Sequence, residues 1–323
     1  MTVAAVQRAV LPGIPAGYEA AFGQVWHNHV AAQLTLPAPQ LVEMDCNIGV
    51  KGKGFEYIFG RGKGLVSIRY NGVQLLDDTV RPNFWRAPTN NDEGCAEPFA
   101  FAFWKTAGLY ARCDHLTAET RGEFVTVRAV YTLPDGQTLP IDFAIDCAGR
   151  CDITMTWQGE RAEVPEFGLL FPLRRELTEV SYQGLGPRET TADRTAGGKM
   201  GVWNYNVRQD FAQNSPVYPQ ECGSRTGVYR AALTGRDTEV PGIRFASDDG
   251  MTFSALPYTP HELENARHLY ELPRDDNKTI VRCAAFQRGV GGDNSWGAKP
   301  HADACFAVEK GMTFSFSIQK QNG

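Results

Sequence analysis

Apolar and polar residues mostly alternate along this chain, and glycine or proline interrupts the alternation at short intervals. A period of two is typical of β-strands with one buried face, whereas a helix repeats its apolar positions every three or four residues. The segment GLVSIRYNGVQLL places Asn71-Gly72 between two alternating runs, which predicts a β-hairpin with a tight turn. FVTVRAVYTLPDGQTLPIDFAID repeats this design around Pro134-Asp135-Gly136, and the strand-like CDITMTWQG follows it directly.

The second half of the chain keeps the same pattern. Alternating runs occur in GVYRAALTG, GIRFASDDGMTFSALPY and CFAVEKGMTFSFSIQ. The best helical signal is short and lies around Thr259 to His268, where Thr259 suits the cap and Pro260 suits the first helical position. Because strands and helices do not alternate, the pattern predicts an all-β fold, a large antiparallel sandwich, in preference to a (β/α) barrel or a dinucleotide-binding fold.

The opening of the chain differs from the rest. Residues 1–40 contain one strand-like stretch, VWHNHVAAQLTL, between proline-containing segments, and this opening has too little apolar content to fold alone. We therefore predict a leader, residues 1–40, and one large β domain, residues 41–323. The proline-rich segment Leu36–Gln40 marks their expected boundary.

Charge and targeting signals narrow the class of partner. The formal charge of −5 and the isoelectric point near 5.7 provide no basic face for nucleic acid or an anionic membrane. Arg8, Pro12 and Pro15 interrupt the N-terminal apolar residues, so no signal peptide is predicted. No stretch approaches the roughly twenty apolar residues of a membrane-spanning helix. We expect a soluble, cytoplasmic protein.

Familiar cofactor and nucleophile motifs are missing from the sequence. The eight cysteines form no CxxC pair, which favours reduced thiols over a structural zinc site. No GxSxG or GxxxxGK[ST] motif appears, so neither a nucleophile elbow nor a nucleotide phosphate site is predicted. HELENARH, the densest ionisable cluster, lacks the spacing of HExxH and is better explained as a solvated helical turn than as a metal site.

Two segments could line a binding site. In RPNFWRAPTNNDEG, residues 81–94, Phe84 and Trp85 could end a core strand that leads into a surface loop. Alternatively the loop rims a site, with Gly94 as a hinge. In GVGGDNSWG, residues 289–297, Trp296 could plug the core beneath a turn, or could stack on the C–H face of a pyranose. Sequence spacing nominates no pair of carboxylates for glycoside hydrolysis.

The chain resembles a known family from about Val42 onward. It is similar to the C-terminal domain of family 2 β-galactosidases, and still more to the small subunit of their heterodimeric bacterial forms. The resemblance rests on six segments in order: FEYIFGRGKGLVSI, RPNFWRAPTNNDEG, GLGPRETTADR, PQECGSRTG, LPYTPHELENARH and RGVGGDNSWG.

This resemblance implies a two-sheet super-sandwich, the fold shared with galactose mutarotases. It also implies that the catalytic glutamates lie on a separate (β/α) barrel, so no catalytic residue is expected in this chain. Trp296, in one motif with Asp293 and Asn294, is expected to line the galactose pocket. The segment expected to move over that pocket contains Asn90, Asn91, Asp92 and Gly94.

The implied partner is a β-galactosidase large subunit or catalytic barrel, acting with retention on terminal β-galactosides of the lactose type. No cofactor is expected in this chain, and magnesium or sodium in the complete enzyme stays open, as does a homo-oligomer. The leader resembles the last strand of the preceding immunoglobulin-like domain, which hints at a fragment of a longer enzyme, and a natural small subunit stays open as well. Two alternatives remain: a stand-alone carbohydrate-binding or aldose-1-epimerase-like module, and a purely structural role.

Overall fold

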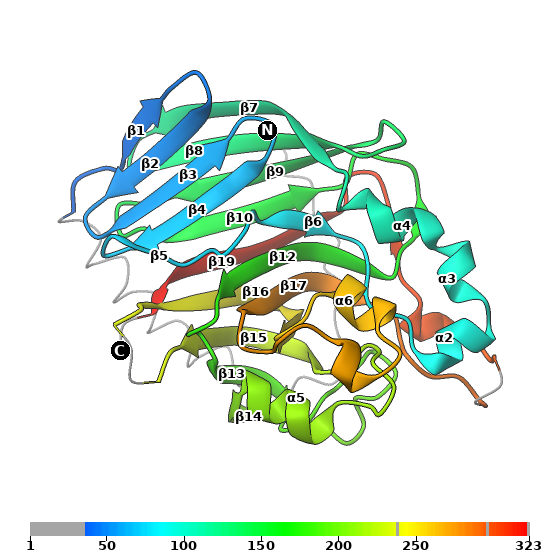
Figure 1. The fold of residues 1–323 in the computed structure, drawn as a ribbon. Helices are drawn as coiled ribbons and strands as arrows, with labels where there is room; N and C mark the ends of the chain where they lie inside the picture. The colour runs from blue at the N-terminus through cyan, green and yellow to red at the C-terminus, as the bar shows by residue number, and fades with distance from the viewer. Residues whose placement is uncertain (1–35, 237–238, 295–296, 322–323) are drawn as a thin grey trace. The chain divides into compact units, whose positions relative to one another are not determined.

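The computed structural model describes residues 36–236, 239–294 and 297–321 (Figure 1). The chain divides into two units, Met1–Leu36 and Pro37–Gly323. The predicted leader, residues 1–40, lies mostly outside the described residues and stays a prediction.

The first sheet contains five antiparallel strands that are neighbours in chain order. They are β1 (Gln40–Glu43), β2 (Asn47–Gly52), β3 (Phe55–Gly60), β4 (Gly64–Tyr70) and β5 (Val73–Gln74). Between β4 and β5, Asn71 and Gly72 have φ angles of 51° and 81°. Positive φ at both turn residues is the geometry that an Asn-Gly hairpin requires, so the predicted hairpin is confirmed.

A second sheet of twelve strands forms most of the domain. Along its main path the order is β14-β13-β15-β16-β19-β10-β9-β8-β7, and β17, β12 and β6 extend from β16. The strand bounds are β6 (Arg81–Asn83), β7 (Arg112–Arg121), β8 (Phe124–Thr132), β9 (Thr138–Ile145), β10 (Cys151–Thr156), β12 (Glu166–Arg174), β13 (Glu179–Gly186), β14 (Lys199–Asn206), β15 (Ser224–Thr234), β16 (Gly242–Leu256), β17 (Lys278–Gln287) and β19 (Thr313–Gln321). Two short strands, β11 (Ala162–Glu163) and β18 (Ala307–Val308), pair separately.

The long strand β16 explains how the large sheet divides. Its first part pairs with β19, and its last part, from Thr252 to Leu256, pairs with β17. All of the strand pairs in the described residues are antiparallel. The prediction of an all-β fold built from large antiparallel sheets is therefore confirmed.

The helices are short. They are α2 (Asn90–Gly94), α3 (Glu97–Ala100), α4 (Ala102–Ala107), α5 (Val207–Asn214) and α6 (Pro260–Asn265), with 3₁₀ turns η1 (Leu269–Glu271) and η2 (Ala302–Ala304). Figure 1 shows α2, α3 and α4 following one another along one side of the sheets, and α5 beside β13 and β14. The predicted turn near Thr259 is confirmed, because Thr259 caps α6. Within the described part of the chain, no helix is long and apolar enough to cross a membrane.

One large apolar cluster fills the space between the sheets. The alternation in β9, where every second residue is buried, supplies one face of it. Trp157 is fully buried, and its ring lies 6.0 Å from Phe84 and 5.9 Å from Trp104, measured between centroids. Phe84 is thus a core residue. A smaller cluster, which includes Phe211, Leu256 and Leu263, packs beneath α5 and α6.

Candidate functional site

The structure brings the two candidate segments, residues 81–94 and 289–297, into contact. Gly297 has a φ of +113°, and a Cβ added there would lie 2.6 Å from the carbonyl oxygen of Gly94. Only glycine accepts both that backbone angle and so close an approach. Two stretches that are far apart in the sequence therefore meet at one edge of the domain.

Residues 90–94 differ from the sequence expectation, since they form the helix α2 and not an irregular loop. Thr89 caps the helix: the Asp92 backbone N–H donates to the Thr89 hydroxyl at 3.3 Å, and the Thr89 N–H donates to the Asp92 carboxylate at 2.6 Å. This reciprocal box makes a helical turn favourable in a sequence rich in turn-forming residues. Asn90 is exposed, Asn91 is half-buried, Asp92 is buried and Gly94 ends the helix. Movement of this segment stays a prediction.

A buried arginine joins the two segments. Arg86 donates to both carboxylate oxygens of Asp92, at 2.5 and 3.0 Å. The same guanidinium donates to the backbone carbonyls of Arg288 at 3.2 Å and Gly289 at 2.7 Å. Burial alone would lower the pKa of Arg86, but the charge and hydrogen bond of Asp92, together with the charges of Glu221 and Glu97, outweigh it and the pKa is raised. Burial alone would raise the pKa of Asp92, but Arg86 and the hydrogen bonds from Thr89 together outweigh it and the pKa is lowered. Both groups are therefore charged at neutral pH.

A second buried arginine connects the start of the glycine-rich segment to α3. Arg288, at the start of the glycine-rich segment, donates to the carboxylate of Glu97 in α3 at 2.5 to 3.1 Å. It also reaches Glu163 at 3.3 Å, and its guanidinium lies 5.1 Å from the centre of the Phe101 ring. Arg86 thus binds the start of the glycine-rich segment, and Arg288 binds α3, the helix that follows α2. These bonds hold the edge together without a strand pair.

The glycine-rich segment is held by one more carboxylate. The N–H of Gly291 donates to Asp193 at 2.8 Å, and Thr191 donates to the other oxygen of Asp193 at 2.7 Å. Further along, Asp293 and Asn294 are exposed. Asp293 lies 2.7 Å from the Nε2 atom of His301, and this hydrogen bond raises the pKa of His301. Both Asp293 and Asn294 therefore face solvent at this edge.

Trp296, the central residue of the sequence prediction, lies outside the described residues. The stacking of Trp296 on a sugar therefore stays a prediction.

A buried charge network, which was not predicted from the sequence, lies behind this edge. Glu166 in β12 accepts from Arg282 of β17 at 2.6 Å, and Arg282 also donates to Glu221 at 2.5 Å. Gln287 donates to both carboxylates, and Asn83 of β6 donates to Glu166 at 2.6 Å. Burial, partly opposed by the Arg282 charge, raises the pKa of Glu166. One sequence signal could have indicated this network: Glu166 and Arg282 are charged residues within the otherwise apolar strand sequences EFGLLFPLR and IVRCAAFQ.

This network anchors the ends of three strands and is not arranged for hydrolysis. The Glu166 and Glu221 side chains are each 1% exposed, and both are bonded to Arg282. A glycosidase needs two carboxylates that reach the anomeric carbon from solvent-accessible positions. These two carboxylates cannot do so. Their role is to hold β6, β12 and β17 in register where the two candidate segments leave the sheet.

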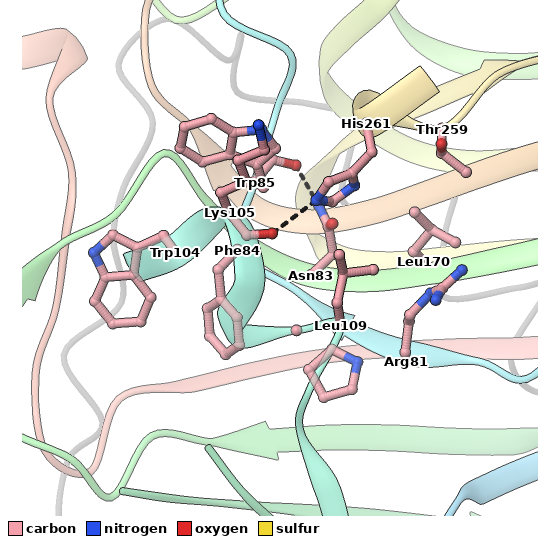
Figure 2. A pocket seen from close by; sticks show the side chains of 12 residues that line it. Arg81, Asn83, Phe84, Trp85, Trp104, Lys105, Leu109, Leu170, Thr259 and His261 are labelled. Atoms are coloured by element: carbon pink, nitrogen blue, oxygen red, sulfur yellow. Dashed lines mark hydrogen bonds between the residues drawn. The ribbon is translucent and has the colours of Figure 1, made fainter. Parts of the chain in front are cut away.

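An open pocket of about 460 Å³ lies beside the first segment. Figure 2 shows the side chains that line it. Arg81, Trp85 and Lys105 line it together with His261. The His261 Nε2 atom lies 2.7 Å from the carbonyl oxygen of Lys105, and burial lowers the pKa of this histidine. Among the described residues, none that lines the pocket is Asp or Glu. The pocket therefore offers aromatic and cationic groups without a carboxylate pair.

The HELENARH cluster is structural in this arrangement. Glu262 completes the cap of α6 with Thr259 and accepts from Lys278 at 2.6 Å. Glu264 accepts from the Trp85 indole at 2.9 Å and from Lys105 at 2.8 Å. Throughout residues 36–236, 239–294 and 297–321, no group of three His, Cys, Asp or Glu side chains could hold a metal ion. In the described residues, no disulfide joins any of the eight cysteines.

Comparison with known proteins identifies the family. Residues 51–318 match a family model described as "Beta galactosidase small chain". The chain belongs to the β-galactosidase small-chain family. This confirms the resemblance found in the sequence, and the matched range includes both candidate segments.

Relatives of this small chain are of two lengths. It is 32% identical over 308 residues to a "Beta-galactosidase small subunit" of Latilactobacillus sakei, covering 85% of this chain and 95% of that protein. It is 37% identical to a "Beta-galactosidase" of Lactobacillus delbrueckii subsp. bulgaricus, covering 87% of this chain but 28% of that protein. A "Beta-galactosidase" of Streptococcus thermophilus is 33% identical, with 99% and 31% covered. The small chain thus spans less than a third of these longer relatives.

Among solved structures, a putative aldose 1-epimerase of Escherichia coli K12 is similar to 87% of this small chain and 98% of its own chain, with 12% identity and a TM-score of 0.45.

Proposed function

We propose that this chain is a non-catalytic part of a β-galactosidase, and that it completes the galactoside pocket when it docks on a catalytic barrel. The pocket wall consists of the start of α2, with the exposed Asn90 and the half-buried Asn91, and of the segment that contains Asp293, Asn294 and Trp296. The proposed substrates are terminal β-galactosides of the lactose type. The proposed setting is the cytoplasm, where thiols stay reduced.

One observation carries this proposal beyond family membership. The segments predicted to rim the pocket are distant in sequence, yet Arg86 ties α2 to the carbonyls of Arg288 and Gly289. A binding wall needs this preorganisation, because a side chain that is ordered only on binding loses affinity to conformational entropy. The buried arginines supply it before any ligand arrives.

The chemical step belongs to the partner. Retaining hydrolysis uses one carboxylate as nucleophile and a second as acid and base, about 5 Å apart. In this chain, Trp296 stacks on the apolar face of the galactose ring, while Asp293 and Asn294 are placed in the same segment to hydrogen-bond with hydroxyl groups. These contacts orient the sugar and exclude water from the reacting carbon.

Reconstitution tests the proposal. The purified chain is mixed with a matching β-galactosidase large fragment, and hydrolysis of a chromogenic galactoside is followed in the mixture and in each part alone. We expect hydrolysis only in the mixture. Hydrolysis by the isolated chain would contradict the non-catalytic role, and a stable but inactive complex would contradict pocket completion.

The geometry of the described residues does not favour the aldose-1-epimerase alternative. An epimerase needs a general acid and a general base on opposite sides of the sugar ring oxygen. The pocket that contains His261 is lined by no carboxylate, and the His261 ring bonds to a backbone carbonyl. Rapid mutarotation of α-galactose by the purified chain would reverse this conclusion.

A further inference from the structure

A separate open pocket of about 560 Å³ lies beside α5. Two segments that carry the family resemblance, GLGPRETTADR and PQECGSRTG, supply most of its lining. Neither is part of the proposed galactoside wall, although Asp193 of the first segment binds the backbone of Gly291. The charged and polar lining residues include Arg188, Glu189, Arg194, Asp210, Asn214 and Arg225. Phe211 and Leu256 add apolar surface.

The charges in this lining do not cancel. Arg225 pairs with Asp210 at 2.8 Å, and Arg194 pairs with Glu189 at 2.9 Å. Arg188 remains. It donates to the Asn214 side-chain oxygen at 3.3 Å, and among the described residues it has no ion pair. The lining therefore carries one positive charge more than it carries negative charges.

The base of the pocket is rigid. The Arg225 side chain is 1% exposed, and its guanidinium lies 4.1 Å from the centre of the Tyr205 ring. Arg225 also donates to the carbonyl of Gly223 at 2.5 Å, while the Gly223 N–H donates to Glu189 at 2.6 Å. The two segments are thus bound to each other around the opening, and the exposed Arg188 stands at a preformed site.

We propose that this pocket binds a small oxyanion, a carboxylate or a phosphate group, through the guanidinium of Arg188. A guanidinium presents two parallel N–H donors that match two oxygens of such a group, and the pair is charge-assisted. The apolar surface of Phe211 and Leu256 suits a short carbon skeleton attached to the anion. A neutral sugar leaves the excess charge uncompensated. The residues that line this pocket are not those of the proposed galactoside wall, so the proposal does not rest on the proposed function.

Isothermal titration calorimetry of the full chain at low ionic strength tests this site. The probes are inorganic phosphate, citrate and, as a neutral ligand, galactose, with sodium chloride as an ionic-strength control. We expect saturable binding of phosphate or citrate at one site, with the tighter of the two identifying the preferred oxyanion. Galactose and chloride should not compete for it.

Two variants locate the binding. Arg188→Gln should weaken the oxyanion about tenfold or more, because a hydrogen bond to a charged group is lost. Its fold should persist, because Arg188 is exposed. Arg274→Gln removes another exposed arginine, one that pairs with Asp276, and should leave the affinity unchanged. The proposal is overturned by no saturable binding of either anion, by unchanged affinity in Arg188→Gln, by equal losses in both variants, or by competition from galactose.

Discussion

The large sheet contains two cross-strand ion pairs of the same chemistry in opposite surroundings. Arg128 and Asp142 face each other on β8 and β9 with both side chains partly in solvent, 57% and 28% exposed. Arg282 and Glu166 join β17 and β12 with side chains 3% and 1% exposed. The first pair lies on an exposed sheet face, whereas the second lies in the buried network behind the two candidate segments.

This difference determines what each pair does. Water screens the exposed pair, so its net contribution to stability is small. The buried groups have lost their hydration, and each depends on its partners to compensate. Buried charge therefore makes the register of β6, β12 and β17 hard to change, at the place where the two candidate segments leave the sheet.

The largest effect is expected from Arg282→Met. This change leaves Glu166 and Glu221 buried without their shared cation, and should lower the free energy of unfolding by about 3–5 kcal/mol. Urea unfolding followed by tryptophan fluorescence measures it. A loss no larger than that of Arg128→Met would show that burial does not separate the two pairs.

An intermediate effect is expected from Asp92→Asn, which weakens the link between α2 and Arg86. A buried hydrogen bond to a charged group is lost, at a cost of about 1–3 kcal/mol at neutral pH. Because the pKa of Asp92 is lowered in the folded state, its contribution is fully present above the unfolded pKa of about 3.9 and is lost as pH falls through the folded value. The difference between wild type and variant should therefore shrink in acid.

Unfolding curves at a series of pH values check this prediction. Asp142→Asn, which alters the exposed pair on β9, is the matched control and should cost less at neutral pH. A wild-type advantage over Asp92→Asn that stays constant from neutral pH into acid would contradict the account of this link.

The smallest effect is expected from Arg128→Met, because the pair with Asp142 is exposed. The free energy of unfolding should change by about 1 kcal/mol or less, and added salt should reduce the change further. Urea unfolding at low and high salt measures it. A cost comparable to that of Arg282→Met would remove the distinction on which the comparison rests.

Much of the fold could be predicted from the sequence, because its signals are local. Alternation in β8 and β9 follows from one buried face, the Asn71-Gly72 turn from positive φ, and the Thr259 cap from a side-chain bond to the next turn. Each of these depends on residues that are close in the chain. Of the two interpretations of residues 81–94, the one with Phe84 in the core agrees with the structure at that residue.

The candidate site was less accessible to sequence reasoning, because its contacts are long-range. Residues 90–94 are an exception: they were expected to be a loop, although the signal for a helix was local, a capping box between Thr89 and Asp92. The Arg282 network joins residues from four separate segments, and no spacing rule announces it. What sequence reasoning supplied was the pair of segments themselves, through a resemblance that the family match confirms.

The central claim is that this chain forms a wall of the galactoside pocket and does more than hold a catalytic domain in place. Steady-state kinetics of the reconstituted enzyme with Trp296→Ala tests it most directly, with Phe124→Ala as a control, since Phe124 is an exposed aromatic in the β7–β8 hairpin. The account predicts that kcat/KM for a galactoside falls about tenfold or more in Trp296→Ala, a loss of ~1.4 kcal/mol of transition-state binding, and stays unchanged in Phe124→Ala. Unchanged kinetics in Trp296→Ala would contradict the claim and leave the chain a structural role alone.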